Sequence, residues 1–258
     1  MANLEFDRIR RNADAQFLAY TLQFPSDSVE MDYHYRMKKD HTFHVCHYSL
    51  QIAQSLKIAE KEIILCYLIA LFHDIARFPQ LAQFRTFRDQ LSFNHALHSS
   101  KILRNLGIIN ALEKSDQDAI YRAIEMHNLP VLPLSESPKT LMFSQILRDA
   151  DKLDILHFFG DYYQTDRPFQ TIIDQDLSKA QEISHEVLEL YLAEKAIPIS
   201  MVHTLLEFKA LHLGWIFQLN FPKSREILKN ERTIVKIWES IPASDLKNQL
   251  ASKIQAYL

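Results

Sequence analysis

Glycine is scarce in this sequence, and its scarcity limits the folds that are open to the chain. The 258 residues include 3 glycines, Gly107, Gly160 and Gly214, and each of them is isolated. Loops that bind phosphate or dinucleotides through backbone amides need clustered glycines, so no stretch of the chain can form one. Tight hairpin turns also depend on glycine, which disfavours a β protein with many hairpins.

Apolar residues recur at helical spacing along almost the whole chain. Residues 63–72 are apolar on all sides, as in a helix buried inside a domain. No segment alternates convincingly with a period of two. The sequence therefore predicts an all-α protein, with one domain over residues 1–258. Further helices are expected over residues 40–56, 94–106, 116–126, 141–159, 175–192, 201–219 and 223–239, with a short one after Pro242.

Charge and targeting signals exclude several classes of partner. Lys and Arg number 29 against 32 for Asp and Glu, and no basic block is present, so we expect no nucleic-acid partner. The longest apolar run has ten residues, too few to cross a bilayer. The charged N-terminus lacks the apolar segment of a secretory signal. With two cysteines in apolar patterns, these features predict a cytoplasmic protein that has no membrane partner.

The 12 histidines are the second unusual count, because imidazole serves as both a proton carrier and a metal ligand. The pair His73-Asp74 directly follows the buried run, where ionisable groups are costly unless they are paired or bind a cation. His41 lies on the apolar stripe of its helix and should point inward. Asp151 follows Leu147 by one turn on another apolar face. A core histidine beside a helix-capping aspartate is the structural alternative for the His73-Asp74 pair.

The order His41, His73-Asp74, Asp151 resembles the HD-domain metal-dependent phosphohydrolase superfamily. The matching segments are Lys38-x-x-His41-x-x-x-Val45, Leu71-Phe-His73-Asp74-Ile-Ala-Arg77-Phe78 and Leu147-Arg-Asp-Ala-Asp151-Lys152-Leu. A bacterial branch of the superfamily looks closest, on Thr86-Phe87-x-Asp89, His95-Ala96 and His127-Asn128; where its members commonly carry Asp before His-Ala, this chain has Asn94. The resemblance implies an HD-type helical bundle over about residues 35–160, with a C-terminal helical extension of about 165–258 packed on it.

The resemblance also implies one or two divalent transition-metal ions, with Mn, Fe, Co, Zn, Ni and Mg all open. The implied ligands are His41, His73, Asp74, His95, His127 and Asp151. In two-metal members of the superfamily one aspartate bridges the ions, a role that falls to Asp74. His41, His73 and Asp151 would complete one ion's ligands, and His95 with His127 those of the other. His98, one turn after His95, is one alternative to it, and a phosphate-binding or supporting role is the alternative for His95 and His127. His44 is expected to have a structural or supporting role.

The implied function is hydrolysis of a small phosphorylated substrate, a nucleotide phosphomonoester or phosphodiester, by attack of a metal-activated hydroxide at phosphorus. The candidate catalytic residues are Asp74, Lys152 and Arg77, and the candidate substrate contacts are Lys38, Arg77, Arg85, Asn128 and Lys152. For each basic side chain the alternative is a solvated surface charge. The aromatic residues Phe158, Phe159, Tyr162 and Tyr163 are expected in the core, with a wall against a nucleobase as the alternative.

Two other functions are compatible with the same residues. HD-fold oxygenases hold two irons in a similar six-ligand pattern, activate O₂ and cleave C–C or C–P bonds. A non-catalytic nucleotide-binding or signalling module with this fold is the third alternative, although such a protein would be expected to lose ligands. The ligand types are the same for hydrolase and oxygenase, so the metal content has to separate them.

Overall fold

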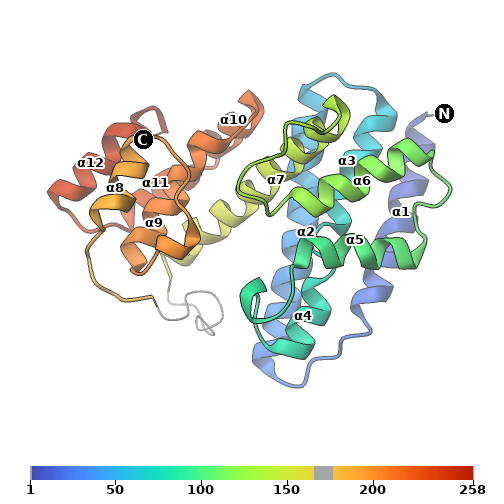
Figure 1. The fold of residues 1–258 in the computed structure, drawn as a ribbon, viewed down its shortest axis with the longest axis horizontal. Helices are drawn as coiled ribbons and strands as arrows, with labels where there is room; N and C mark the ends of the chain where they lie inside the picture. Colours follow the sequence, from blue (N-terminus) through green and yellow to red (C-terminus); the bar gives the residue numbers. More distant parts are fainter. Residues whose placement is uncertain (1, 166–176, 258) are drawn as a thin grey trace. The chain divides into compact units, whose positions relative to one another are not determined.

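A computed structural model describes residues 2–165 and 177–257. The regular elements in these ranges are helices, and one isolated β-bridge joins Ser178 and Thr204 (Figure 1). The all-α prediction is confirmed. The chain divides into two compact units, Met1–Asp151 and Lys152–Leu258. The single domain expected over the whole chain stays a prediction. No helix within the described ranges has both the length and the apolar character needed to span a membrane.

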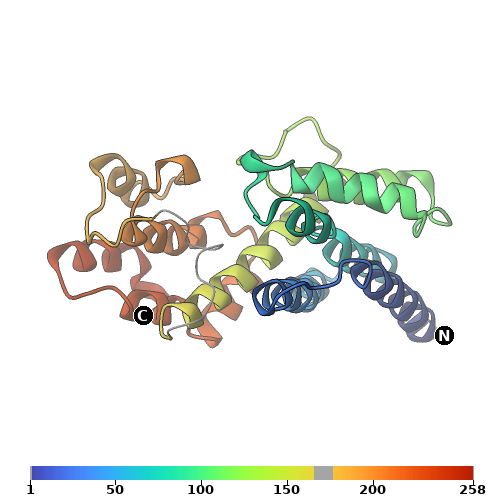
Figure 2. The ribbon, with the colours of Figure 1, turned by 90° about the horizontal axis from the view of Figure 1, so that it is seen from below.

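The N-terminal unit is built around one buried helix, α3 (Glu60–Phe72), which packs against α1, α2, α5 and α6 (Figure 1 and Figure 2). Residues 65–72 are all buried, as the uniformly apolar run predicts. Because α3 ends at the centre of the unit, the residues that follow it are buried too. The surrounding helices are α1 (Ala2–Thr21), α2 (Val29–Ser55), α4 (Arg77–Phe84), α5 (His95–Leu106), α6 (Lys114–Met126) and the first part of α7 (Pro138–Tyr162).

Helix α2 begins earlier than its expected start at Asp40. The hydroxyl of Ser28 accepts a hydrogen bond from the Met31 amide at 3.2 Å and caps the helix. Acidic residues in the first turn also suit the positive end of the helix dipole. Asp40 therefore lies inside the helix, and Lys38 and His41 are three residues apart on one continuous helix.

The short segment between α3 and α5 contains a helix that the periodicity did not predict. In α4, Pro79 lies in the first turn, where a missing amide hydrogen costs little. The start of α5 agrees with its expected start at Asn94, because the Asn94 side chain accepts from the Leu97 amide at 3.1 Å. Gly107 ends α5 in the left-handed conformation, with φ of 66°.

The C-terminal unit is a second helical cluster, in which α9 packs against α8 and α11, and α12 packs against the same two helices. Its buried side chains include Val187 and Tyr191 of α8 and Leu250 of α12, and the Tyr191 hydroxyl donates to the Leu250 carbonyl at 3.0 Å. Its helices are the end of α7, α8 (His185–Leu192), α9 (Leu205–Gly214), α10 (Pro222–Asn230), α11 (Thr233–Glu239) and α12 (Asp245–Ile254).

Three helices expected here differ in the structure. The helix expected over 201–219 begins only after Thr204, whose hydroxyl accepts from the Glu207 amide at 3.0 Å, and it tightens to a 3₁₀ turn from Trp215. The helix expected over 223–239 is broken at Arg232, whose φ of 54° lies in the left-handed region. The helix expected over 175–192 starts outside the described residues, and α8 begins at His185.

Aromatic side chains at the end of α7 belong to the core of the C-terminal unit. The Phe159 ring stacks on His212 with 4.1 Å between centroids, and the Tyr163 hydroxyl lies 3.0 Å from His212 Nδ1. Burial lowers the pKa of His212 to about 3. Phe159 and Tyr162 are both buried. These contacts support the core interpretation of the aromatic group.

Candidate metal centre

Six side chains that the sequence places far apart converge inside the N-terminal unit. His41 comes from the middle of α2, His73 and Asp74 follow α3, His95 is the first residue of α5, His127 follows α6 and Asp151 lies in α7. Their ligand atoms form three overlapping groups, in each of which the atoms lie within 4.8 Å of one another. The groups are His41, His73 and Asp74; His73, His127 and Asp151; and Asp74, His95 and His127.

Asp74 lies between two pairs of imidazoles and is almost fully buried. Its Oδ2 is 3.5 Å from His41 Nε2 and 3.8 Å from His73 Nε2. Its Oδ1 is 3.5 Å from His95 Nε2 and 3.8 Å from His127 Nε2. The two oxygens of one carboxylate therefore face different histidine pairs, which is the geometry that a bridging ligand requires.

Asp151 lies next to one of these histidine pairs, His41 and His73. Its Oδ1 lies 3.3 Å from His41 Nε2 and 3.7 Å from His73 Nε2. We call the space between these three residues and Asp74 Oδ2 the first ion position. The second ion position lies between His95, His127 and Asp74 Oδ1. The first thus offers two carboxylates and two imidazoles, and the second one carboxylate and two imidazoles.

Hydrogen bonds fix which nitrogen of each ring faces the cluster. His73 Nδ1 donates to the Ala70 carbonyl at 2.7 Å, and His127 Nδ1 donates to the Ile124 carbonyl at 2.7 Å. A carbonyl oxygen can only accept, so in each ring Nδ1 carries the proton. In the neutral ring Nε2 then has a lone pair and no hydrogen.

His95 has the same tautomer, because its Nδ1 donates to Asp89 Oδ2 at 2.6 Å. His95 Nε2 and His127 Nε2 lie 3.0 Å apart, and in these neutral tautomers both are acceptors, so neither can donate to the other. Among the described residues, His73 Nε2 and Asp74 Oδ1 have no hydrogen-bond partner. Imidazole acceptors that converge in the interior without donating to one another are costly unless a cation lies between them, and a metal ion fits this set of nitrogens and oxygens.

Asp74 and His127 have the protonation states that metal ligands need. Burial alone would raise the pKa of Asp74, but the positive charges of Lys38 and Arg77 hold it well below its usual range, so the carboxylate is charged. Burial lowers the pKa of His127 to about 3, so its ring is neutral near pH 7. Metal ions bind the charged carboxylate and the neutral imidazole.

Two of the predicted basic residues border the cluster. Lys38 Nζ lies 2.8 Å from Asp74 Oδ2, and Arg77 Nε lies 3.4 Å from Asp74 Oδ1. Their side chains are 15% and 14% exposed, so neither is a solvated surface charge. Each oxygen of Asp74 thus has one cationic side chain near it, in addition to its histidine pair.

The other predicted substrate contacts have different neighbours. Arg85 forms an ion pair with Asp27, and about half of each side chain is exposed. Lys152 Nζ lies 6.0 Å from the centre of the Trp215 ring in the C-terminal unit. The side-chain amide of Asn128 donates to Asp89 and Asn94 at 3.3 and 3.2 Å. Their roles toward a substrate stay predictions.

Two further histidines, His98 and His44, have other surroundings. The His98 ring stacks on Phe93 with 4.0 Å between centroids, whereas His95 faces Asp74. The structure therefore favours His95 over His98 at the second ion position. The side chain of His44 is exposed on α2.

Asp89 is the residue whose importance the sequence did not reveal. It appeared only as the last letter of the motif Thr86-Phe87-x-Asp89, with no role attached. In the structure its Oδ1 accepts from Arg77 Nη1 and Gln80 Nε2, both at 3.1 Å, and its Oδ2 accepts from His95. Its presence in that motif was the only available signal, because an aspartate in a connecting segment has no periodic pattern.

Comparison with known families agrees with this geometry. Residues 39–156 match the family model of the HD domain, and that range includes all six residues of the cluster. Residues 39–156 therefore form an HD domain, with a buried His/Asp cluster that can hold metal ions. Searches of curated proteins and of solved structures give no match.

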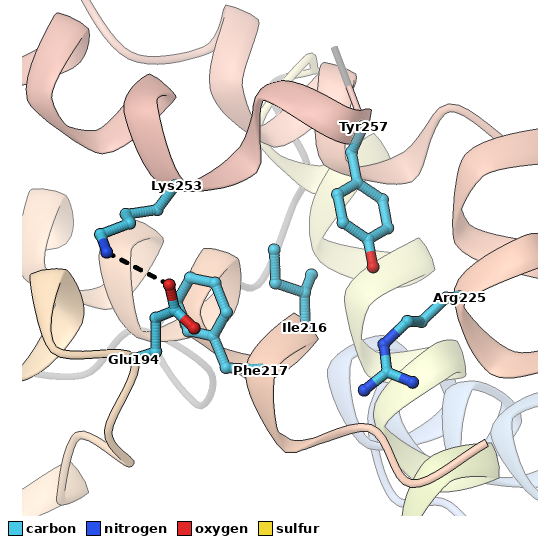
Figure 3. A pocket seen from close by; sticks show the side chains of 6 residues that line it. All are labelled: Glu194, Ile216, Phe217, Arg225, Lys253 and Tyr257. Atoms are coloured by element: carbon cyan, nitrogen blue, oxygen red, sulfur yellow. Dashed lines mark hydrogen bonds and ion pairs between the residues drawn. The ribbon is translucent and has the colours of Figure 1, made fainter. Parts of the chain in front are cut away.

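The C-terminal unit has a separate pocket of about 260 Å³ (Figure 3). Lys253 Nζ and a carboxylate oxygen of Glu194 form an ion pair at 3.2 Å on one side of it, and Arg225 and Tyr257 lie on the other. The described residues that line the pocket are Glu194, Ile216, Phe217, Arg225, Lys253 and Tyr257, and no predicted site residue is among them.

Proposed function

We propose that this protein is a metal-dependent hydrolase that cleaves a small phosphorylated molecule, a nucleotide phosphomonoester or phosphodiester. One observation carries the proposal: three imidazole Nε2 atoms with fixed acceptor tautomers converge on the charged carboxylate of Asp74. When bound, two divalent cations lower the pKa of a water molecule and stabilise negative charge on a phosphoryl oxygen. HD domains in general act on small phosphorylated substrates, which supports this choice of substrate class.

The chain's own residues have distinct proposed tasks at this site. Asp74 would supply one oxygen to each ion position. Lys38 and Arg77 place fixed positive charge next to Asp74, where it can offset the charge of a phosphate group. Asn128, Arg85 and Lys152 are proposed as further substrate contacts.

Protein thiols are unsuited to act as the nucleophile. Cys46 and Cys66 are both buried, and burial raises the pKa of each thiol above its ordinary value. A buried neutral thiol is a poor nucleophile near pH 7. Water is therefore the proposed attacking group, which is the role that a pair of divalent cations supports.

The test is phosphate release by the full-length protein after removal of metals and separate addition of Mn²⁺, Co²⁺, Zn²⁺ and Mg²⁺. We expect hydrolysis of at least one class in a panel of nucleoside phosphates and phosphodiesters, and a loss of about 100-fold or more in Asp74→Ala. His47→Ala is the matched control, because His47 is exposed and contacts Gln51 at 2.7 Å. Folded, metal-loaded protein that hydrolyses nothing in the panel would contradict the proposal.

The same preparation separates the two alternative functions. Two irons in the protein as purified, with consumption of O₂, would assign an oxygenase. Tight nucleotide binding without turnover in any metal would assign a binding module. Phosphate turnover that depends on the added divalent ion is the outcome that the hydrolase proposal requires.

A further inference from the structure

We infer that Asp89 is the positioning residue of the second ion position: it orients the His95 ring and restrains Arg77 beside Asp74. The inference rests on the proposed metal centre and deepens it, because it assigns a residue that acts on one ion position and leaves the other largely unaffected. Asp89 belongs to the one-turn 3₁₀ helix η1 (Asp89–Leu91), between α4 and α5.

The contacts of Asp89 Oδ2 fix both the ring and the main chain of His95. This oxygen accepts from His95 Nδ1 at 2.6 Å and from the His95 backbone amide at 3.3 Å. Two contacts to one residue determine the position of the helix terminus and the rotation of the ring together. With the Nδ1 proton donated to Asp89, Nε2 keeps its lone pair and lies in the cluster, 3.5 Å from Asp74 Oδ1 and 3.0 Å from His127 Nε2.

The acceptor behind His95 differs from those behind the other two rings with an assigned tautomer. His73 and His127 donate to the neutral carbonyls of Ala70 and Ile124, whereas His95 donates to a charged carboxylate. A carboxylate acceptor makes the imidazole a stronger metal ligand than a carbonyl does. The loss of Asp89 should therefore weaken the second ion position more than the first.

The other oxygen of Asp89 anchors this arrangement to the protein. Asp89 Oδ1 accepts from Gln80 Nε2 at 3.1 Å, and Gln80 is fully buried and also donates to Ser92 Oγ at 2.7 Å. The two oxygens of Asp89 thus connect the segment between α4 and α5 to Gln80 on α4 and to His95 on α5. A positioned carboxylate of this kind costs little reorganisation when an ion binds.

Asp89 also restrains the nearest competitor of an ion for Asp74. Arg77 Nη1 donates to Asp89 Oδ1 at 3.1 Å and to the Phe87 carbonyl at 2.7 Å, while Arg77 Nε stays 3.4 Å from Asp74 Oδ1. Asp74 Oδ1 is the oxygen that faces the second ion position. Without Asp89, the Arg77 guanidinium is less restrained and can pair more closely with Asp74. This closer pairing lowers the affinity of the second ion position, as does the loss of orientation of the His95 ring.

The experiment counts bound metal in the full-length protein by equilibrium dialysis against Mn²⁺ or Co²⁺, in wild type, Asp89→Ala and Asp89→Asn. We expect two ions per chain in wild type. In each variant we expect the second ion to bind about 10–100-fold more weakly and the first to be nearly unchanged. Asp118→Asn is the matched control, since that carboxylate pairs with Lys114 at 3.0 Å on the surface.

A double variant separates positioning from a merely structural role. In a His95→Ala background, Asp89→Asn should cause a smaller further loss of the second ion than it does in wild type, because the ring is already missing and only the restraint on Arg77 is left to lose. Asp89→Asn leaves a side-chain oxygen that can accept from a ring N–H. Metal binding can therefore be measured in this variant even if Asp89→Ala fails to fold. Circular dichroism of the metal-free variants shows whether the fold is kept.

Three outcomes would overturn the inference alone: wild type that binds one ion, variants that bind both ions as wild type does, or variants that lose both ions equally. Wild type that binds no ion would instead contradict the proposed function itself. The two failures are therefore distinguishable from the wild-type isotherm.

Discussion

Removing the Asp74 carboxylate should abolish the stabilisation that metal ions give to the folded protein. Its two oxygens face both ion positions, at 3.5 Å from His41 Nε2 and 3.5 Å from His95 Nε2, so a single substitution takes one ligand from each. An ion that binds only the folded state at 100 times its dissociation constant contributes about 2.7 kcal/mol. Two positions together therefore stabilise wild type by about 5 kcal/mol.

In Asp74→Ala the first position keeps His41, His73 and Asp151, while the second keeps only its two imidazoles. If the affinity of the first position falls 100-fold, the same ion concentration equals the new dissociation constant, and the gain shrinks to about 0.4 kcal/mol. Urea unfolding with Mn²⁺ and with chelator measures this difference within each variant, so any change in metal-free stability cancels. Equal stabilisation of wild type and Asp74→Ala by the metal would refute the reasoning.

Substitutions at three further positions test the fold by urea unfolding. Phe72→Ala should cost about 3–5 kcal/mol, because Phe72 is fully buried at the end of α3; a loss below about 1 kcal/mol would contradict that packing. Thr204→Ala removes the hydroxyl that caps α9 and should cost about 1 kcal/mol, whereas Thr204→Ser should be nearly neutral. Burial would raise the pKa of Asp116, but hydrogen bonds from Lys139 and Lys61 hold it below its ordinary value. Its charge therefore stabilises the fold above about pH 4 and loses that effect as the pH falls further, so Asp116→Asn should cost about 1 kcal/mol at pH 7 and less at pH 3.

The fold class and the core helix were predictable from local pattern. Few glycines and a 3.6-residue period leave little besides helices, and the apolar run over residues 63–72 has no polar side to expose. Helix ends were harder, because they depend on single residues. Ser28 rather than Asp40 caps α2, and Arg232 adopts a left-handed conformation that no periodicity indicates.

The members of the His/Asp cluster could be predicted from the sequence, but the geometry of the cluster could not. The order of His41, His73-Asp74 and Asp151 is a linear pattern that a sequence displays directly. The division of Asp74 between two histidine pairs, and the tautomers set by the Ala70 and Ile124 carbonyls, depend on contacts between distant segments. Asp89 shows the same limit, since its role follows from five donors brought together by the fold.

The most direct test of the central claim is anomalous X-ray diffraction from crystals soaked in Mn²⁺ or Co²⁺. Two peaks are predicted in the N-terminal unit. One should lie between Asp74 Oδ2, His41, His73 and Asp151, and the other between Asp74 Oδ1, His95 and His127. No peak in the cluster, or peaks only at other residues, would contradict the assignment of these side chains as a metal centre.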